Sequence, residues 1–97
     1  MYVKFHTHGD RTVVAICDKE LIGKKLKDKN ISIEITERFY KGELKSEQEV
    51  CKIFQEATNM NIIGKKAIEL ALKQGIIAKD SIKTIKNIPH AQIYELA

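Results

Sequence analysis

The chain changes from a strand pattern to a helix pattern within residues 31–57, which read ISIEITERFYKGELKSEQEVCKIFQEA. Residues 31–36 alternate between isoleucine and a polar residue, which is the period of a half-buried strand. The alternation predicts that Ile31, Ile33 and Ile35 face the core while the residues between them face water. It is the clearest strand signal in the sequence.

Helical spacing begins at Ser46, the first residue of the capping-box sequence Ser-Glu-Gln-Glu. Apolar residues then recur at the spacing of one helix face: Val50, Ile53, Phe54 and Ala57. A second helix is predicted to begin near residues 59–61, with Asn61 as its cap, and to end at Gly75. Its apolar stripe would be Ile63, Ala67, Leu70 and Ala71.

Working outward, the first seventeen residues predict a hairpin. Residues 2–7 and 12–17 are rich in β-branched and aromatic types, and His8-Gly9-Asp10-Arg11 between them has the composition of a tight turn. The polar stretch 23–30 predicts a loop, and Tyr40, Gly42 and Glu43 predict a turn before the first helix.

The C-terminal part predicts two more strands, residues 82–86 and 91–96, with Pro89 excluded from a central strand position. The elements then follow the order β-β-β-α-α-β-β. Because strands and helices are segregated, we predict an α+β fold: one domain over residues 1–97, in which a mixed β-sheet carries two helices packed on one face.

The composition is that of a lysine-rich globular protein with a net charge of +4. Its 97 residues include 15 Ile, 15 Lys and only 2 Arg, which resembles the composition of thermophile proteins. The modest positive charge fits either a nucleic-acid partner or a solvated lysine surface.

No apolar run approaches the roughly 20 residues that cross a bilayer, so we expect no membrane partner. The N-terminus lacks the layout of a signal peptide, which favours a cytoplasmic protein with free thiols. Cys17 and Cys51 do not form a CxxC pair, which excludes a zinc ribbon and a thioredoxin motif. We expect no bound cofactor, and the sequence gives no oligomeric state.

Four segments in order carry a resemblance to a known family: Cys17–Lys24, Arg38–Glu43, Asn61–Gly64 and Ile88–Gln92. Together they resemble the small archaeal proteins grouped as domain of unknown function 424. The resemblance extends over nearly the whole chain. It implies a short, stand-alone cytoplasmic protein of α/β type, for which a connection with translation or RNA metabolism is plausible.

Three residues are candidates for catalysis: His90, Cys17 and Asp18. Pro89 fixes the backbone before His90, and a positioned histidine can transfer protons or bind phosphate. A thiol beside a histidine can be a nucleophile if Asp18 or Asn61 orients the pair. The alternatives are a structural histidine bonded to a loop carbonyl and a buried, inert cysteine.

The candidates for RNA or anion binding lie at two glycines and on the last strand. Gly23 would form a turn that presents Lys24 and Lys25, although the spacing of a nucleotide phosphate loop is absent. The set at the second predicted helix and the last strand comprises Asn61, Gly64, Lys65, Lys66, His90 and Gln92. Each lysine pair can equally be an ordinary solvated surface.

His6 and His8 lie two residues apart on the first predicted strand, so both project from one face. Such a pair can begin a metal site with His90 as a third ligand, but a closed zinc site needs four ligands, and we predict no metal site. Tyr40 would either stack on a base or fill the edge of the core.

These features favour a module that binds RNA or a ribonucleoprotein, which predicts one continuous positive face with Lys24, Lys25, Lys65 and Lys66. The alternative is a small enzyme or ligand-binding domain centred on His90 and Cys17, which predicts that both line one pocket. A further alternative is a structural subunit of a larger assembly, which predicts an exposed apolar patch.

Overall fold

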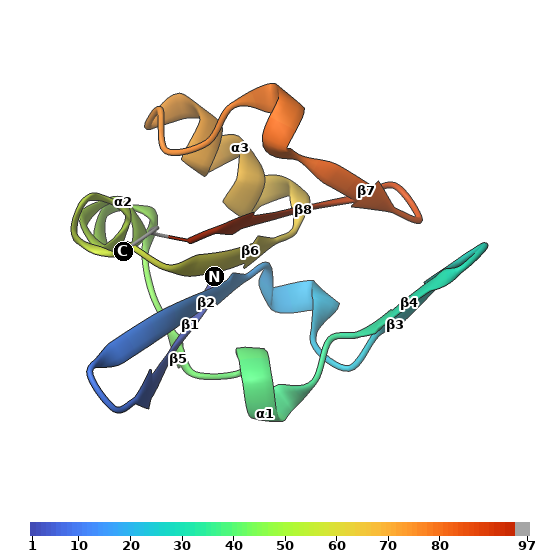
Figure 1. The fold of residues 1–97 in the computed structure, drawn as a ribbon, viewed down its shortest axis with the longest axis horizontal. Coiled ribbons are helices and arrows are strands. Elements are labelled where there is room, and N and C mark those ends of the chain that lie inside the picture. The colour runs from blue at the N-terminus through green and yellow to red at the C-terminus, as the bar shows by residue number, and fades with distance from the viewer. Residues whose placement is uncertain (95–97) are drawn as a thin grey trace.

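Residues 1–94, the part of the chain that the computed structural model describes, form a six-stranded sheet, a separate hairpin and three α-helices (Figure 1). The sheet order is β5-β1-β2-β6-β8-β7, and β3 pairs with β4 in the hairpin. In chain order the elements are β1 (Tyr2–His8), β2 (Arg11–Cys17), β3 (Lys25–Asp28), β4 (Ile31–Glu34), α1 (Glu37–Tyr40), β5 (Glu43–Leu44), α2 (Glu47–Glu56), β6 (Met60–Ile63), α3 (Lys65–Lys73), β7 (Lys83–Ile85) and β8 (Ile88–Ile93).

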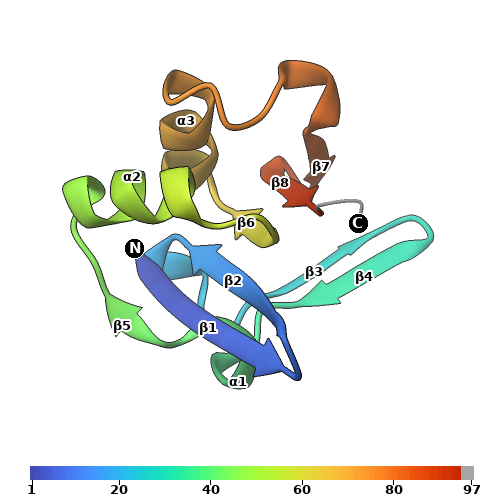
Figure 2. The same cartoon turned by 60° about the vertical axis from the view of Figure 1, so that its left-hand side comes forward.

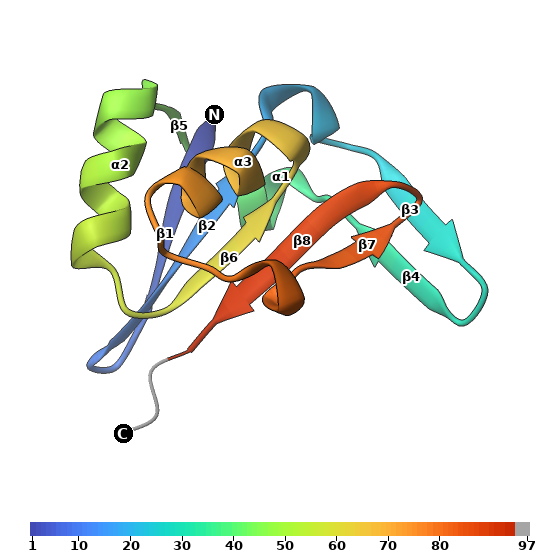
Figure 3. The ribbon, with the colours of Figure 1, turned by 90° about the horizontal axis from the view of Figure 1, so that it is seen from above.

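Helices α2 and α3 cover one face of the sheet, as Figure 3 shows from above. Val50 and Phe54 of α2 and Ala67 and Ile68 of α3 are buried in one apolar cluster with the inner residues of β1, β2 and β6. The burial of this amphipathic helix layer against the sheet is the main stabilising contribution of the fold.

A second, smaller cluster lies on the opposite face of the sheet. Leu21, Leu26, Ile35 and Tyr40 pack there over Ala15, Cys17, Ile63 and Ile85. These covering residues come from a one-turn 3₁₀ segment (Lys19–Leu21), the hairpin base and α1. They cover only part of this face, and the covered part includes the C-terminal ends of β2 and β6.

The α+β prediction is confirmed, and several local predictions hold. Strands β1 and β2 form the expected hairpin. Ser46 and Glu49 exchange the two hydrogen bonds of a capping box at α2. Gly75, with φ +69°, follows the end of α3 as expected.

The predicted order of elements is wrong in the middle of the chain. Residues 25–28 were expected in a loop but form β3, because they pair with β4. Figure 2 shows this hairpin extending beyond the sheet. Ile31 lies near its tip and is 55% exposed, whereas Ile35 at its base is fully buried, so the alternating isoleucines do not all face the core.

The second helix was predicted to begin too early. Residues 60–63 form β6, which is buried, parallel to β2 and antiparallel to β8, and α3 begins only at Lys65. Asn61 is therefore a strand residue and not a helix cap. A short, fully buried apolar run lacks the periodicity that distinguishes a strand from a helix.

The predicted turn at Tyr40 also differs, since residues 37–40 form the single turn α1 and residues 43–44 form β5. The two predicted helices, α2 and α3, pack on one face of the sheet as expected, and the unpredicted turn α1 lies on the opposite face (Figure 1). No helix in the described part of the chain is long and apolar enough to cross a membrane.

Pro89 lies inside β8, between β6 and β7, although a central strand position was predicted to be excluded. Its carbonyl accepts a hydrogen bond from Gly64 N at 2.9 Å, just beyond the end of β6. The Gly64 carbonyl accepts from Ile68 N in α3, so it needs no donor from Pro89. The last strand was predicted over residues 91–96; β8 spans Ile88–Ile93, and residues 95–97 lie outside the described part.

Candidate functional site

The side-chain oxygen of Asn61 is the centre of a polar cluster at the boundary of the covered sheet face. It accepts a hydrogen bond from the Tyr40 hydroxyl at 2.8 Å and lies 3.2 Å from His90 Nε2. Tyr40 and Asn61 are buried and His90 is half-buried. A hydroxyl and a ring nitrogen that share one amide oxygen hold the Asn61 side chain in a fixed orientation.

Because an amide oxygen only accepts, His90 Nε2 carries the proton in this arrangement and Nδ1 keeps its lone pair. Burial, and then the charge of Lys83, lower the pKa of His90 below its ordinary 6.5. Burial, then the nearby Cys17 and Tyr94, raise the pKa of Tyr40 to about 12. At neutral pH the cluster is therefore uncharged.

Three further side chains share the face of this cluster. Gln92 is the strand partner of Asn61, and Lys83 is the strand partner of His90, so each pair projects to one side of the sheet. Tyr94 follows Gln92 by two residues and is exposed. We call the set Asn61, Lys83, His90, Gln92 and Tyr94 the β8 face.

The lowered pKa of His90 predicts a pH dependence of stability. Below pH 6.5 the unfolded chain takes up a proton at His90 that the folded protein binds less readily, so the free energy of unfolding falls as the pH drops through 6.5. Urea unfolding on both sides of this pH should show that the free energy of unfolding falls more steeply with decreasing pH in the wild type than in His90→Gln. Gln92→Ala replaces a neighbouring side chain that does not titrate, so it should keep the wild-type dependence of the free energy of unfolding on pH. The same dependence in all three proteins would refute this role of His90.

Asp18 occupies the N-terminus of α3. Its carboxylate is only 3% exposed and accepts hydrogen bonds from Lys66 N and Ala67 N, each at 2.9 Å. Gly64, with φ +117°, allows this approach, because a Cβ there would lie 2.3 Å from Asp18 Cγ. The N–H groups of Lys66 and Ala67, at the helix start where an anion was predicted to bind, are thus already bonded to Asp18, and the N–H of Gly64 is bonded to the Pro89 carbonyl.

Cys17 is fully buried, and its thiol donates to the Asp18 carbonyl at 3.2 Å. Burial, then the charges of Asp18 and Glu20, raise the pKa of Cys17 to about 12, so it stays a thiol at neutral pH. Strand β6 separates Cys17 from His90, since Ile63 pairs with both. Two strand spacings, roughly 10 Å, exceed the reach of a nucleophile–base hydrogen bond.

The four lysines predicted to form one positive face lie in different layers. Lys24 and Lys25 belong to the hairpin, and Lys65 and Lys66 open α3 on the other side of the sheet (Figure 1). The structure therefore brings together only Asn61, His90 and Gln92 from the predicted binding residues.

His6 and His8 share a face of β1 as expected, but they do not approach His90. Three strand spacings, roughly 14 Å, separate β1 from β8 in the sheet order. The ring of His6 stacks on Phe39 at 4.5 Å, and His6 Nε2 lies 2.7 Å from the Phe39 carbonyl oxygen. Within residues 1–94 no group of three His, Cys, Asp or Glu side chains is arranged to hold a metal.

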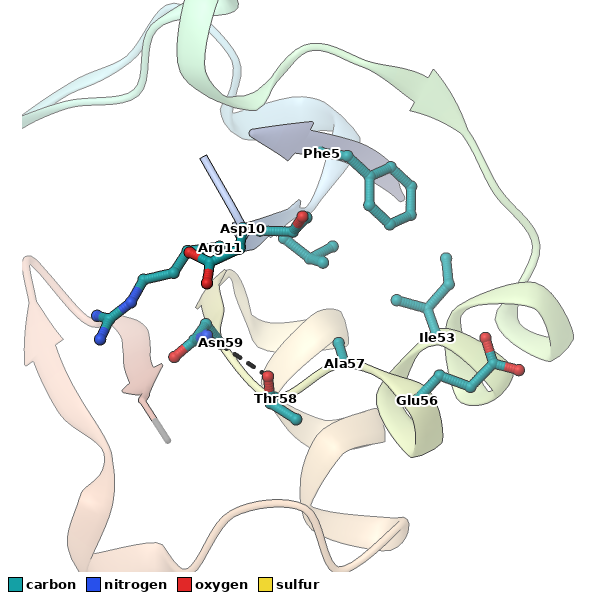
Figure 4. Close-up of a pocket in the computed structure, with 10 residues that line it drawn as sticks. Phe5, Asp10, Arg11, Ile53, Glu56, Ala57, Thr58 and Asn59 are labelled. Atoms are coloured by element: carbon teal, nitrogen blue, oxygen red, sulfur yellow. Dashed lines mark hydrogen bonds between the residues drawn. The ribbon is translucent and has the colours of Figure 1, made fainter. Parts of the chain in front are cut away.

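A groove of about 410 Å³ lies between the β1–β2 hairpin and the C-terminal end of α2 (Figure 4). Phe5, Val14, Ile53 and Ala57 are its apolar lining residues. Its polar lining includes the acidic residues Asp10 and Glu56, and the side chain of Arg11 extends away from Phe5 and Ile53. An apolar groove with acidic residues at its margin does not favour a phosphate group.

Sequence reasoning missed Lys83 and Tyr94 as site residues. A two-residue turn at Lys86-Asn87 would have set the register that places Lys83 beside His90. The alternation His90, Gln92, Tyr94 would have placed Tyr94 on the same face. Tyr40, expected to pack at the core edge, is buried with its hydroxyl bonded to Asn61.

Comparison with known proteins identifies the family of this chain and a similar solved structure. The model of the family described as "Protein of unknown function (DUF424)" matches residues 5–96, which confirms the resemblance noted from four sequence segments. A crystal structure of an uncharacterized conserved protein from Methanopyrus kandleri is 26% identical, with a TM-score of 0.77 over 99% of this chain and 94% of that chain. No curated protein matches the chain significantly.

Proposed function

The chain belongs to the DUF424 family, and from that premise we propose that it is a binding module for single-stranded RNA that uses the β8 face. The observation that carries this proposal is the combination on one sheet face of an exposed aromatic ring, two amides and a lysine. Tyr94, Gln92, Asn61 and Lys83 supply them. Sheet faces of this kind bind unpaired bases by stacking and read their edges with amides.

The fixed amide of Asn61 suits the reading of a base edge. Its oxygen is occupied by Tyr40 and His90, whereas its nitrogen has no hydrogen bond within residues 1–94. No buried side-chain nitrogen in that part lacks a partner, so this nitrogen reaches solvent. A donor held in place loses little conformational entropy when it binds an acceptor on a base.

Unpaired cations around the β8 face would meet the phosphates. Within residues 1–94, Lys83 and Lys86 form no ion pair, nor do Lys25 and Lys27 on the hairpin whose base packs near Ile85. By contrast, Lys45 before α2 and Lys73 in α3 pair with glutamates. The lysines that form no ion pair therefore include those on the hairpin and at the β7–β8 turn, where they can contact phosphates.

An enzyme centred on His90 and Cys17 has less support. Cys17 is a buried thiol, Asp18 caps α3, and β6 separates both from His90. What remains at His90 is a neutral ring held by Asn61, which fits a hydrogen-bonding surface better than a nucleophile–base pair.

The first test is binding of a mixed-sequence single-stranded RNA over a salt series. With three to five phosphate contacts, we expect log Kd to change with log salt with a slope of roughly 2 to 4. Lys83→Glu should weaken binding about tenfold, while Lys52→Glu, the same charge change on α2, should change it less than about twofold. Absence of binding at low salt, or equal losses in both variants, would refute the proposal.

A second variant separates stacking from charge. Tyr94→Ala should weaken RNA binding by roughly 5- to 150-fold, because stacking of a base on an aromatic ring contributes about 1–3 kcal/mol. Tyr94→Phe keeps the ring and should bind as the wild type does. A loss in Tyr94→Phe equal to that in Tyr94→Ala would point to the hydroxyl and contradict stacking.

A further inference from the structure

The β3–β4 hairpin and strand β7 border a hollow of about 360 Å³. Its lining residues come from the tip of the hairpin and from β7: Asp28, Lys29, Asn30, Ile31, Thr84 and Ile85. The hairpin extends past the sheet (Figure 2), so the hollow lies outside the packed core. Sites for small molecules have volumes of roughly 300–1,000 Å³, and the hollow is therefore large enough for a single nucleobase.

The hollow adjoins the β8 face. Lys83 belongs to that face, and Ile85 follows it by two residues on the same side of β7. Ile85 in turn lines the hollow. Leu26, at the base of the hairpin, is buried in the same cluster as Ile85, on the sheet face opposite α2 and α3. An RNA strand whose bases stack on the β8 face can therefore continue into the hollow.

The hairpin side of the hollow carries a free carboxylate. Asp28 lies opposite Ile31 in the hairpin register and two residues from Leu26, so its side chain is on the inner face of the hairpin with theirs. Within residues 1–94 this carboxylate accepts no hydrogen bond and forms no ion pair. An ionised carboxylate offers two acceptor oxygens and no donor.

The β7 side of the hollow carries a free backbone donor. Ile85 and Ile88 flank a two-residue turn and form the hydrogen-bonded pair next to it. The following pair, Thr84 and Pro89, therefore exchanges no hydrogen bonds, as the missing N–H of Pro89 also requires. The N–H and C=O of Thr84 point to the free edge of β7, where Thr84 lines the hollow.

We infer that this hollow binds a guanine base of the single-stranded RNA, an inference that rests on RNA binding by the β8 face. Among the four common bases, guanine alone has two adjacent donors on its Watson–Crick edge, N1–H and N2–H, and the two oxygens of Asp28 can accept both. Guanine O6, on the same edge, is an acceptor for the N–H of Thr84. Adenine and cytosine would turn a ring-nitrogen lone pair toward the carboxylate, and uracil has a single N–H between two carbonyl groups.

The apolar surface and the charge around the hollow fit a nucleotide. Ile31 is 55% exposed near the tip of the hairpin, where a base would cover it. Residues 25–31 and 83–88 contain five lysines and one aspartate, a net charge of +4 that equals the net charge of the whole chain. None of these lysines forms an ion pair within residues 1–94. They can bind the phosphates and offset the repulsion between a phosphate and Asp28.

Fluorescence anisotropy with short, unstructured RNAs tests the inference. A strand of adenine and cytosine that contains a single guanine should bind the wild type roughly 5- to 150-fold more tightly than the same strand with adenine at that position. Inosine at that position lacks the N2 amino group but keeps N1–H and O6, so it should give an intermediate affinity.

Two variants locate the preference for guanine. Asp28→Ala removes both acceptor oxygens, so the guanine and adenine strands should bind it within about twofold of each other. Glu34→Ala is the matched control, because Glu34 is also an exposed carboxylate of the hairpin but lies opposite Lys25 on the outer face. It should keep the wild-type preference. Circular dichroism checks that both variants are folded.

Three results would overturn the inference. Equal affinity of the wild type for the guanine and adenine strands would exclude the guanine site and leave RNA binding by the β8 face in place. A folded Asp28→Ala variant that keeps the wild-type preference would place guanine recognition elsewhere. If the wild type binds neither strand at low salt, RNA binding itself is wrong, and the guanine site with it.

Discussion

Gly64→Ala should destabilise the protein by about 3–5 kcal/mol, the largest single effect that we expect. The backbone at Gly64 has φ +117°, a value that residues other than glycine adopt only under strain. The added methyl group would also lie 2.3 Å from Asp18 Cγ, a buried group that cannot move without losing its bonds to α3. Urea unfolding at neutral pH measures this loss.

Gly9→Ala is the matched control for that variant. Gly9 also has a positive φ, +65°, but no atom lies within 4 Å of a Cβ there. Gly9→Ala should be destabilised only by the backbone strain, which costs about 1–2 kcal/mol. If Gly64→Ala cost no more than Gly9→Ala, the close approach of Asp18 to α3 would be refuted.

Asp18→Ala should cost about 2–4 kcal/mol, because it leaves the N–H groups of Lys66 and Ala67 without a partner at the buried start of α3. Asp18→Asn keeps one acceptor oxygen and should lose less. Glu20→Ala removes an exposed carboxylate two residues away and should stay within about 0.5 kcal/mol of the wild type. A stability of Asp18→Ala equal to that of Glu20→Ala would contradict the capping role.

The two sites should also be coupled. In the double variant Asp18→Ala/Gly64→Ala, the methyl group at 64 no longer meets a carboxylate, so the combined loss should be smaller than the sum of the single losses by about 1 kcal/mol or more. Simple additivity would mean that the side chain at 18 and the backbone at 64 act independently.

Local signals in the sequence predicted the local parts of the fold. The β1–β2 hairpin, the Ser46–Glu49 capping box and the stop at Gly75 each depend on residues close together in the chain. The strand β6 was missed because a four-residue buried run has no diagnostic period. The cap of α3 was missed because its acceptor, Asp18, lies 48 residues before the donor of Lys66.

In the candidate site, too, the local features could be predicted from the sequence and the contacts between distant residues could not. His90 and Gln92 were recognised from a proline and strand alternation, and they do share a face with Asn61. The role of Asn61 could not be predicted, since it depends on Tyr40, 21 residues away, and on His90, 29 residues away. The two lysine pairs were chosen because each follows a glycine in the sequence, and this local signal carries no information about the layer in which each lysine lies.

Photocrosslinking of a thiouridine-containing single-stranded RNA, followed by trypsin digestion and mass spectrometry, tests RNA binding by the β8 face most directly. Cleavage after Lys86 releases residues 87–97, which contain His90, Gln92 and Tyr94 in one peptide. We predict that this peptide carries the main crosslink and loses it in Tyr94→Ala. Crosslinks confined to the exposed surfaces of α2 and α3, in residues 46–52 and 67–73, would contradict the proposal.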